Sequence, residues 1–407
     1  MLKISKALGA VQAQNYHKLE YTSPTQSYYR QGDAVKGEWQ GKLATSMGLS
    51  GEVSPMEFSR VTEGRHPLTD EQMVQHRAQM EYKNPDGTTT KSVEHRAGWD
   101  ATFSAPKSIS LTALVGGDDR IREAHSAAVT IALNELELYT QARIGGNNPA
   151  ETTGKFVAAK FEHDTARPVD CYAAPQLHTH AVIFNVTERA DGSTRALQEK
   201  ALFDSQQFAT AIYQSELTYR LRTFGYEIEA GKSGAPEIKG YSQEYLDASS
   251  PRSQRIKDAM EKRGFSGPEA AEIAAHSTRE KKHTLTPEQV LAAHKEVAAQ
   301  YGNQPRQVVA EASERARTQE HSPDRNARAR EAITYARESL FEREAVADER
   351  MIFRDALRRG MGEALALCAD SARRDRCQCD VRQFGQAMPL SGSELELIAV
   401  FRLASFP

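Results

Sequence analysis

The sequence is poor in cysteine and contains no long apolar run. Only four of its 407 residues are cysteines, and Cys377 and Cys379 form an isolated C-x-C without a partner pair. This spacing supports neither a cysteine zinc site nor a disulfide scaffold. No window approaches the ~18 apolar residues of a membrane helix, and the N-terminus lacks the apolar block of a secretion signal. We therefore expect a cytoplasmic protein that does not insert into a membrane.

An excess of charge of one sign is also missing, as is a nucleotide-binding loop. The formal net charge is −3, which neither supports nor excludes nucleic-acid binding because a balanced total can hide a local basic surface. The motif G-x-x-x-x-G-K-[ST] does not occur. The nearest run, GYEIEAGKS at 225–233, has five residues between its glycines instead of four. We therefore reject a phosphate-binding loop at this position.

The first three quarters of the chain indicate one mixed α/β body, over residues 1–310. A capped helix, two extended runs rich in β-branched and aromatic residues, and a longer helical region follow one another. The predicted elements are a helix from Asp118 or Asp119 to about Arg143, strands at 155–163 and 177–185, a helix at 205–224, a strand at 226–229 and helices within 243–304.

The composition changes after residue 310. Residues 311–365 are rich in Ala, Glu and Arg, which predicts a solvated helical linker. Residues 366–407 show no convincing period, and we expect a poorly ordered tail there.

Three histidines form a candidate metal site. His178 and His180 are two residues apart in a predicted strand, so their side chains project from the same face. His163 ends the preceding predicted strand. If the two strands are neighbours, three imidazoles can converge on one divalent ion and leave positions open for water or substrate. The alternative is that two of these histidines only pack in the core or face solvent.

The identity of the ion is left open by these residues. Imidazole ligands suit zinc, nickel, copper or manganese better than magnesium in isolation. A substrate phosphate and water would add the hard oxygen ligands that magnesium (Mg²⁺) or manganese (Mn²⁺) prefers, and we expect one of these two.

Tyrosines gather in the first thirty residues, among polar neighbours. Tyr16, Tyr21, Tyr28 and Tyr29 lie there, and a phenol in such a segment can reach a substrate, although tyrosine is more often half-buried core. A phenol with a pKa near ~10 needs a base or a nearby cation to act as a nucleophile. Asp100, in a predicted strand, can accept the phenolic proton or orient a histidine; the alternative is a capping role.

Together these segments resemble the MobF-class conjugative relaxases, the TrwC/TraI type of the HUH endonuclease superfamily. The matching stretches are NYHKLEY…SYYRQGDAVKGEWQGKLATSMGL, HRAGWDATFSAPKSISL and FEHDTAR…PQLHTHAVIFNVT, within residues 1–310. The resemblance implies an α/β (α+β) fold in which helices flank a palm-like antiparallel sheet, here with a helical C-terminal extension. It matches the metal ligands to His163, His178 and His180, the acidic residue to Asp100, the first nucleophile to Tyr16, and the second tyrosine pair to Tyr28 and Tyr29.

The chain departs from the family pattern in three places. His17 stands where the family often has a second tyrosine. The two tyrosine sites are twelve residues apart, which is more than the family pattern leads us to expect, and the segment from His163 to His178 is longer than expected. Residues 329–346 resemble the beginning of the helicase region of larger members, but the motor motif is absent. We therefore expect a relaxase without a helicase.

The resemblance implies a conjugative relaxase that nicks one strand of plasmid transfer-origin DNA. Tyr16 would attack a metal-bound phosphate, the 3′-hydroxyl would leave, and a 5′-phosphotyrosine would form that can be reversed to rejoin the strand. The implied partners are single-stranded origin DNA, accessory nicking proteins and a secretion coupling protein. We expect a monomer in the bacterial cytoplasm, with transfer to a recipient cell alongside the DNA as a further implication.

Basic residues after the Asp100 strand and in the later helical region are predicted to contact phosphates; the alternative is plain solvated charge. They are Lys107, Arg252, Arg255, Lys281 and Lys282. Two other functions remain open at this point. A three-histidine hydrolase would activate water and release a free 5′-phosphate, whereas a non-catalytic remnant would only bind origin DNA.

Overall fold

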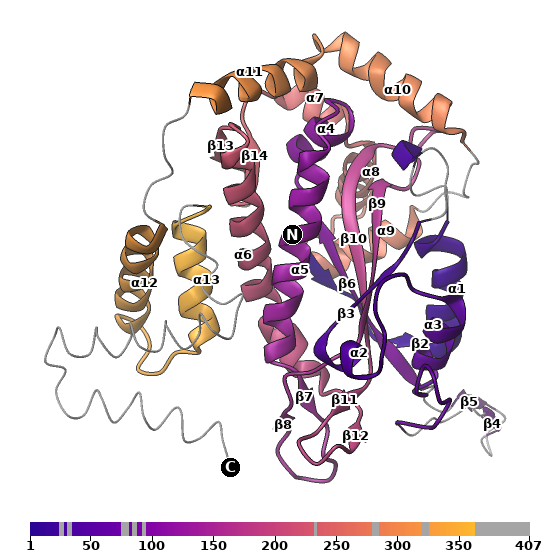
Figure 1. Ribbon diagram of the computed structural model, residues 1–407. Helices are drawn as coiled ribbons and strands as arrows, with labels where there is room; N and C mark the ends of the chain where they lie inside the picture. The colour runs from indigo at the N-terminus through magenta and orange to yellow at the C-terminus, as the bar shows by residue number, and fades with distance from the viewer. Residues whose placement is uncertain are drawn as a thin grey trace, which may run out of the picture.

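An antiparallel sheet is the frame of the fold (Figure 1). The computed structural model describes residues 1–23, 28–30, 35–74, 81–83, 88–91, 95–231, 234–278, 285–318 and 325–362. The main sheet consists of β1 (Leu2–Ile4), β2 (Leu8–Gly9), β3 (Glu38–Gln40), β6 (Arg96–Ser104), β9 (Ala158–Thr165) and β10 (Pro175–Phe184). Four two-stranded pairs complete the described strands: β4 (Glu81–Lys83) with β5 (Thr89–Lys91), β7 (Gln141–Ala142) with β8 (Glu151–Thr152), β11 (Thr187–Glu188) with β12 (Thr194–Arg195), and β13 (Ile228–Ala230) with β14 (Pro236–Ile238).

The strand order in the main sheet is β1-β6-β10-β9-β3, and β2 also pairs with β6. β9 and β10 are consecutive strands that pair antiparallel, and β10 pairs antiparallel with β6 on its other side. The sheet therefore places the central strand β10 between the two strands that carry Asp100 and His163. The predicted antiparallel palm with flanking helices is confirmed.

Helices cover both faces of the sheet. They are α1 (Ala10–Tyr16), η1 (His17–Tyr21), η3 (Tyr28–Arg30), α2 (Lys42–Ser46), α3 (Pro55–Thr62), α4 (Lys107–Leu114), α5 (Arg120–Leu138), α6 (Glu199–Thr223), α7 (Gln243–Ala248), α8 (Pro251–Lys262), α9 (Pro268–Ser277), α10 (Pro287–Gln300), α11 (Gln304–Thr318), α12 (Arg325–Phe341) and α13 (Glu349–Arg359). Helices α4, α5 and α6 share one hydrophobic core with the sheet, whereas α2 and α3 pack with the N-terminal segment on its other face.

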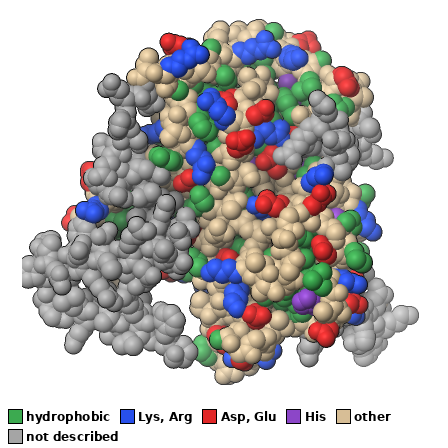
Figure 2. Space-filling view, in the orientation of Figure 1, with side chains coloured by type: hydrophobic (Ala, Val, Ile, Leu, Met, Phe, Trp, Pro, Cys, Tyr) green, Lys and Arg blue, Asp and Glu red, His purple; other side chains and the backbone are tan. Residues whose placement is uncertain are grey.

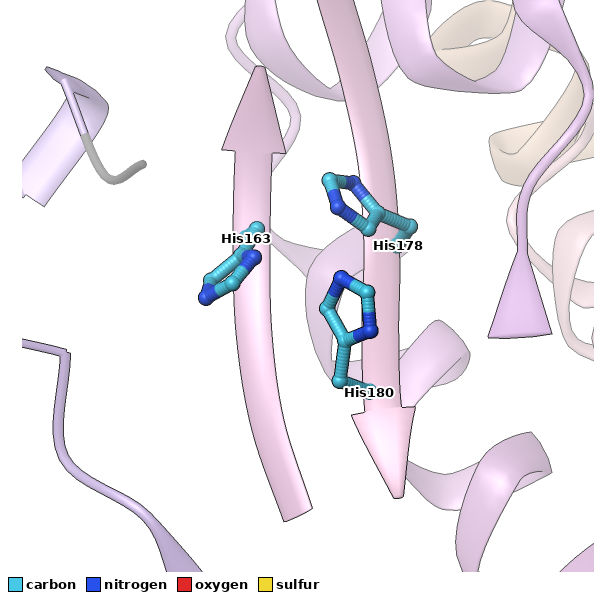
Figure 3. A group of neighbouring side chains, drawn as sticks. All are labelled: His163, His178 and His180. Carbon is cyan, nitrogen blue, oxygen red and sulfur yellow. The ribbon is translucent and has the colours of Figure 1, made fainter. Parts of the chain in front are cut away.

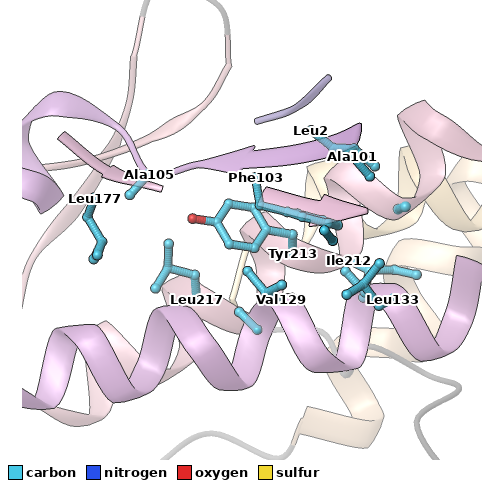
Figure 4. Packing of buried hydrophobic residues seen from close by; sticks show 14 of the residues in the cluster. Leu2, Ala101, Phe103, Ala105, Val129, Leu133, Leu177, Ile212, Tyr213 and Leu217 are labelled. Carbon is cyan, nitrogen blue, oxygen red and sulfur yellow. The ribbon is translucent and has the colours of Figure 1, made fainter. Parts of the chain in front are cut away.

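The main core lies between the sheet and helices α5 and α6 (Figure 4). Phe103 of β6 and Leu177 of β10 point toward these helices and meet Val129 and Leu133 of α5 and Tyr213 of α6. All five side chains are completely buried. Because side chains alternate across a strand, burying this set leaves the intervening residues of β6 and β10 on the opposite face, where the candidate site lies.

The predicted helix at Asp119 is confirmed, with a corrected end. Asp119 is the N-cap residue of α5. The predicted end near Arg143 is wrong, because the helix stops at Leu138 and Gln141–Ala142 form β7. Hydrogen bonds of the hairpin with β8 replace the helical ones at that point.

The other predicted elements are present with shifted bounds. The strands predicted at 155–163 and 177–185 are β9 and β10, which pair with each other. The extended segment between them continues the hairpin, since Ala166 and Val169 bond to Ala174 and Tyr172 through the main chain. The helices predicted within 243–304 are α7, α8, α9 and α10.

The C-terminal helices pack against the body. Helix α11 runs across residue 310 and buries Val308 and Ala312 in the main core. Helix α13 lies on α6, where Leu357 joins the same core and Phe353 contacts Phe208. Residues 366–407, predicted to be a poorly ordered tail, lie outside the described residues, as do Lys281 and Lys282.

The described helices and the charges on one face of the molecule bear on the expected partners. No helix in the ranges given above has both the length and the apolar character needed to cross a membrane. On the face shown in Figure 2, Lys and Arg side chains are interspersed with Asp and Glu side chains.

Candidate active site and metal centre

The register of β9 and β10 brings the three histidines together. His178 lies directly opposite His163 across the two strands, and His180 follows on the same face of β10. The ring centroids are 5.0 to 5.1 Å apart in every pair. Figure 3 shows the three rings gathered over the neighbouring strands. The convergence that a metal site requires is therefore a result of strand pairing.

Each histidine has one ring nitrogen held by an oxygen acceptor. His178 Nδ1 lies 2.9 Å from the carbonyl of Gln176, His163 Nε2 lies 2.9 Å from the carbonyl of Tyr21, and His180 Nδ1 lies 2.7 Å from a carboxylate oxygen of Asp100. A carbonyl or carboxylate accepts a proton and cannot donate one, so these nitrogens carry the hydrogen in the neutral rings. The remaining nitrogen of each ring keeps its lone pair, as in metal-binding histidines whose other nitrogen is bonded to an acceptor.

The cluster fits a divalent metal after a small contraction. One ligand atom from each histidine lies within 4.8 Å of the others. Metal–nitrogen bonds of about 2.0–2.1 Å allow ligand nitrogens to be at most about 4.2 Å apart. Burial, followed by the nearby charge of His180, lowers the pKa of His178 to about 3. His178 is therefore neutral at pH 7, as a ligand must be.

Asp100 connects the metal site to the tyrosine segment. Its Oδ2 atom accepts hydrogen bonds from His180 Nδ1 and from the hydroxyl of Tyr21, the latter at 3.2 Å. Its Oδ1 atom accepts from Thr102 Oγ1 at 3.3 Å. Both carboxylate oxygens are thus engaged, and the contact with His180 is that of a carboxylate orienting a histidine.

Tyr16 lies at the end of α1, beside this network. Its ring packs edge-on against the ring of Tyr21 at 6.1 Å between centroids, and the ring of Tyr21 lies 5.2 Å from that of His180. Gln12, one turn earlier in α1, donates a hydrogen bond of 3.3 Å to the Tyr16 hydroxyl. Tyr16 is half-buried, so its phenol is still reachable, and the ring of Tyr21 connects it to the histidine cluster.

His17, which stands where the family often has a second tyrosine, points into the core. It is 4% exposed and stacks on Phe58 with 4.2 Å between the ring centroids. Burial, and then the charge of Lys18, lowers its pKa to about 4. His17 is therefore a neutral residue of the core on this side of the sheet.

Tyr28 and Tyr29 are anchored elsewhere. Their main-chain N–H groups donate to the carboxylate of Asp164 at 3.0 and 3.1 Å. Asp164 follows His163 in β9 and so points to the opposite face of the sheet. The hydroxyl of Tyr29 lies 2.6 Å from Nδ1 of His294 in α10. Among the described residues, ring contacts to the histidine cluster come from Tyr21, and Tyr28 and Tyr29 make none.

The described basic residues that were predicted to contact DNA have partners within the chain. Lys107 Nζ donates to the carbonyl of Pro175 at 2.7 Å, and burial lowers its pKa to about 7. Arg252 donates to main-chain carbonyls at the end of α9. Arg255 forms an ion pair of 3.1 Å with Asp170 at the tip of the β9–β10 hairpin. Each joins two elements of the body.

Sequence reasoning did not assign Tyr21 or Thr102 to the site. Tyr21 was visible in the tyrosine-rich segment, but nothing in the local pattern separated it from its neighbours. Thr102 is two residues after Asp100 in β6 and lies directly opposite His180. Alternation along the strand was the available signal for Thr102, whereas the position of Tyr21 depends on a tertiary contact.

Comparisons with known proteins agree with this geometry. The TrwC relaxase family model matches residues 10–301. Two proteins named multifunctional conjugation protein TraI, from Escherichia coli and its strain K12, are each 34% identical over 383 and 305 residues, which is 89% and 71% of this chain. The chain spans about a fifth of the length of the first relative and 15% of the second.

Solved structures of conjugative relaxase TrwC match as well. A copper-bound complex with oriT DNA has 34% identity and a TM-score of 0.62, and a metal-bound complex has 33% identity and a TM-score of 0.61. Each match covers 74% of this chain and 99% of the other. Because the family model covers more than half of the chain and a relative is 34% identical over 89% of it, this protein belongs to the TrwC relaxase family.

Proposed function

We propose that this protein is a conjugative DNA relaxase that cuts and rejoins one strand of plasmid transfer-origin DNA through Tyr16. The observation that carries the proposal is the position of Tyr16 beside Tyr21, whose ring contacts His180 of the three-histidine cluster. The relatives named above are a conjugation protein and a relaxase in complex with oriT DNA, which supports the same class of substrate.

The proposed step exchanges one phosphodiester for another. The Tyr16 oxygen bonds to phosphorus, the bond between phosphorus and the 3′-oxygen breaks, and the phenolic proton is transferred, in net, to the departing 3′-hydroxyl. The product is a 5′-phosphotyrosine. Because the bond made and the bond broken are of the same type, the reaction needs no ATP and can run backward to rejoin the strand.

His163, His178 and His180 are the residues that would hold a divalent metal. A bound cation would withdraw charge from the non-bridging phosphate oxygens and so favour attack on phosphorus. The chemistry of the ligands admits copper, nickel and zinc, and one solved structure of the relative TrwC is described as copper-bound. We propose Mg²⁺ or Mn²⁺ as the working ion, because phosphate and water would complete the site with oxygen ligands.

Asp100 is proposed to orient His180. Its carboxylate already accepts two hydrogen bonds on the oxygen nearest the site. A base for Tyr16 would need to lie within hydrogen-bond reach of that phenol, and among the described residues the side-chain partners of the Asp100 carboxylate are His180, Tyr21 and Thr102. The contacts of Asp100 therefore support orientation of the metal ligand in preference to direct proton removal.

The second cleavage, at the end of strand transfer, is assigned in this proposal to Tyr28 or Tyr29. The condition is a rearrangement, because the main-chain N–H groups of both residues are bonded to Asp164 and the hydroxyl of Tyr29 is bonded to His294. The second reaction would begin only after these contacts open.

The remaining parts of the proposal concern partners and place of action. Lys107, Arg252, Arg255, Lys281 and Lys282 are proposed to contribute to the phosphate-binding surface, the first three after exchanging an internal partner for a phosphate. Accessory nicking proteins and a secretion coupling protein would deliver the monomeric relaxase and its strand. The place of action would be the bacterial cytoplasm, followed by entry into a recipient cell, as the conjugation proteins among the relatives suggest.

The test is adduct formation with labelled single-stranded DNA that carries the origin of the parent plasmid. With Mn²⁺ or Mg²⁺, a denaturing gel should show protein joined to labelled DNA, and a chelator should remove this band. Tyr16→Phe should abolish it, because phenylalanine lacks the attacking oxygen. Tyr139→Phe is the matched control, since it removes a hydroxyl that bonds to Glu349 far along the chain.

The possible outcomes separate the alternatives. Full adduct formation by Tyr16→Phe would reject Tyr16 as the nucleophile. Cleavage that leaves a free 5′-phosphate, with no adduct, would favour a hydrolase. Binding of origin DNA without cleavage across several metals would favour a non-catalytic remnant.

A further inference from the structure

Tyr21 makes more contacts to the candidate site than any role in core packing requires. Its hydroxyl donates to Asp100 Oδ2, its main-chain carbonyl accepts from His163 Nε2, and its ring lies beside that of His180. The ring of Tyr21 also contacts the ring of Tyr16, with 6.1 Å between the ring centroids. One residue therefore touches two of the three histidines, the acid and the proposed nucleophile.

A local change of helix type produces this arrangement. Tyr16 ends α1, and η1, a π-helix, follows at His17–Tyr21. The main-chain N–H of Thr22 bonds to the carbonyl of His17, five residues earlier. In an α-helix, residues three or four apart share a face, whereas the wider π turn stacks residues five apart. The π turn thus places Tyr16 and Tyr21 on the same side, and π turns are frequent at functional sites.

The chemical state of Tyr21 suits a hydrogen-bond donor and not a second nucleophile. The side chain is 2% exposed and stacks on Phe161 with 5.2 Å between the centroids. Its hydroxyl donates a hydrogen bond of 3.2 Å to Asp100 Oδ2. A buried phenol whose hydroxyl is engaged with a carboxylate acts as a donor that holds this carboxylate in place.

We propose that Tyr21 is a positioning residue that couples the nucleophile to the metal centre. Its hydroxyl fixes the carboxylate of Asp100 against His180, its carbonyl fixes the tautomer of His163, and its ring forms the wall on which Tyr16 rests. This role deepens the proposed relaxase function, on which it depends. It gives the segment after Tyr16 a role that links metal affinity to the placement of the Tyr16 phenol.

The hydroxyl and the ring can be tested separately. Tyr21→Phe keeps the ring and the carbonyl but removes the donor to Asp100. Residues that hold metal ligands in place typically affect metal affinity by about 10–100-fold, so we expect Tyr21→Phe to weaken Mn²⁺ binding by about 10-fold in calorimetry without DNA. Tyr21→Leu also removes the ring against which Tyr16 packs. Adduct formation at saturating Mn²⁺ should therefore be lower in Tyr21→Leu than in Tyr21→Phe.

Tyr226→Phe is the matched control. The Tyr226 hydroxyl donates to the carboxylate of Asp118 at 2.7 Å, so this change removes a buried tyrosine–aspartate bond at the start of α5. It should lower the free energy of unfolding by an amount similar to Tyr21→Phe while leaving Mn²⁺ affinity unchanged. A general loss of stability would thereby be distinguished from a specific effect on the site.

Two failures can be told apart. If the wild-type protein binds Mn²⁺ and forms the adduct, and Tyr21→Phe and Tyr21→Leu match it in both, the positioning role is overturned while the relaxase function stands. If the wild-type protein instead binds Mn²⁺ through the three histidines and forms no adduct, the relaxase proposal fails. In that case the Mn²⁺ affinity of Tyr21→Phe still decides whether Tyr21 holds the metal site.

Discussion

Replacing Asp100 with Asn should weaken metal binding, because this carboxylate is the acceptor that holds His180. Asp100 Oδ2 lies 2.7 Å from His180 Nδ1 and 3.2 Å from the Tyr21 hydroxyl. Asn keeps the size of the side chain but removes its charge, and its amide can offer an N–H group where an acceptor is needed. His180 would then lose the contact that selects its tautomer.

The magnitude follows from the strength of the two kinds of hydrogen bond. A hydrogen bond to a charged group contributes about 1.5–3 kcal/mol, and a neutral one about 0.5–1.5 kcal/mol. The exchange at His180 should therefore cost about 1–2 kcal/mol of metal-binding free energy, which corresponds to an affinity about 5- to 30-fold lower. The second hydrogen bond, from Tyr21, makes the upper part of this range the expected one.

The assay is calorimetric titration of Mn²⁺ into wild-type protein, Asp100→Asn and Asp118→Asn. Asp118 is a buried aspartate that accepts hydrogen bonds from Arg120 and Tyr226 at the start of α5, so its variant controls for loss of a carboxylate in the body. We expect reduced affinity in Asp100→Asn alone. An affinity of Asp100→Asn within twofold of wild type would refute the reasoning that the carboxylate orients His180.

Two further predictions concern stability. His294 is 2% exposed, and burial lowers its pKa to about 4. In the unfolded chain the same imidazole takes up a proton near pH ~6.5, so the free energy of unfolding falls as the pH drops from there toward about 4. The expected loss between pH 7 and pH 5 is about 2 kcal/mol. His294→Gln should reduce this loss in urea unfolding at the two pH values, and an unchanged pH dependence would contradict the assignment. Leu357→Ala should cost about 2–5 kcal/mol of unfolding free energy, because α13 buries this side chain against α6. It should leave Mn²⁺ affinity intact, and a stability equal to wild type would show that α13 is not part of the folded body.

Much of the fold could be predicted from local patterns. At the start of α5, the side chain of Asp118 accepts a hydrogen bond from the main-chain N–H of Arg120. Proline lies at the first turn of α8 and of α10, and Thr286 caps α10. The end of α5 could not be predicted, because the residues after Leu138 retain helical character and are drawn into a hairpin with β8. That choice depends on pairing with β8, a segment that lies beyond the helix and is not part of its pattern.

The packing of the C-terminal helices also required the tertiary structure. The composition of residues 311–365 indicated solvated helices, and it did not show that Ala312 and Leu357 are buried in the main core. A single apolar residue per turn is a weak signal, since its burial depends on whether a complementary surface such as that of α6 exists elsewhere.

For the site, the sequence by itself determined which residues are chemically able to act. The two-residue spacing of His178 and His180 in a strand placed both on one face, and the polar segment around Tyr16 supplied a phenol. Only the tertiary structure decided that His163 lies directly opposite His178, that Asp100 holds His180, and that Tyr21 joins the tyrosine segment to both. Spacing within a strand is fixed by the geometry of one chain segment, whereas register between strands and contact across the sheet are set by packing of the whole core.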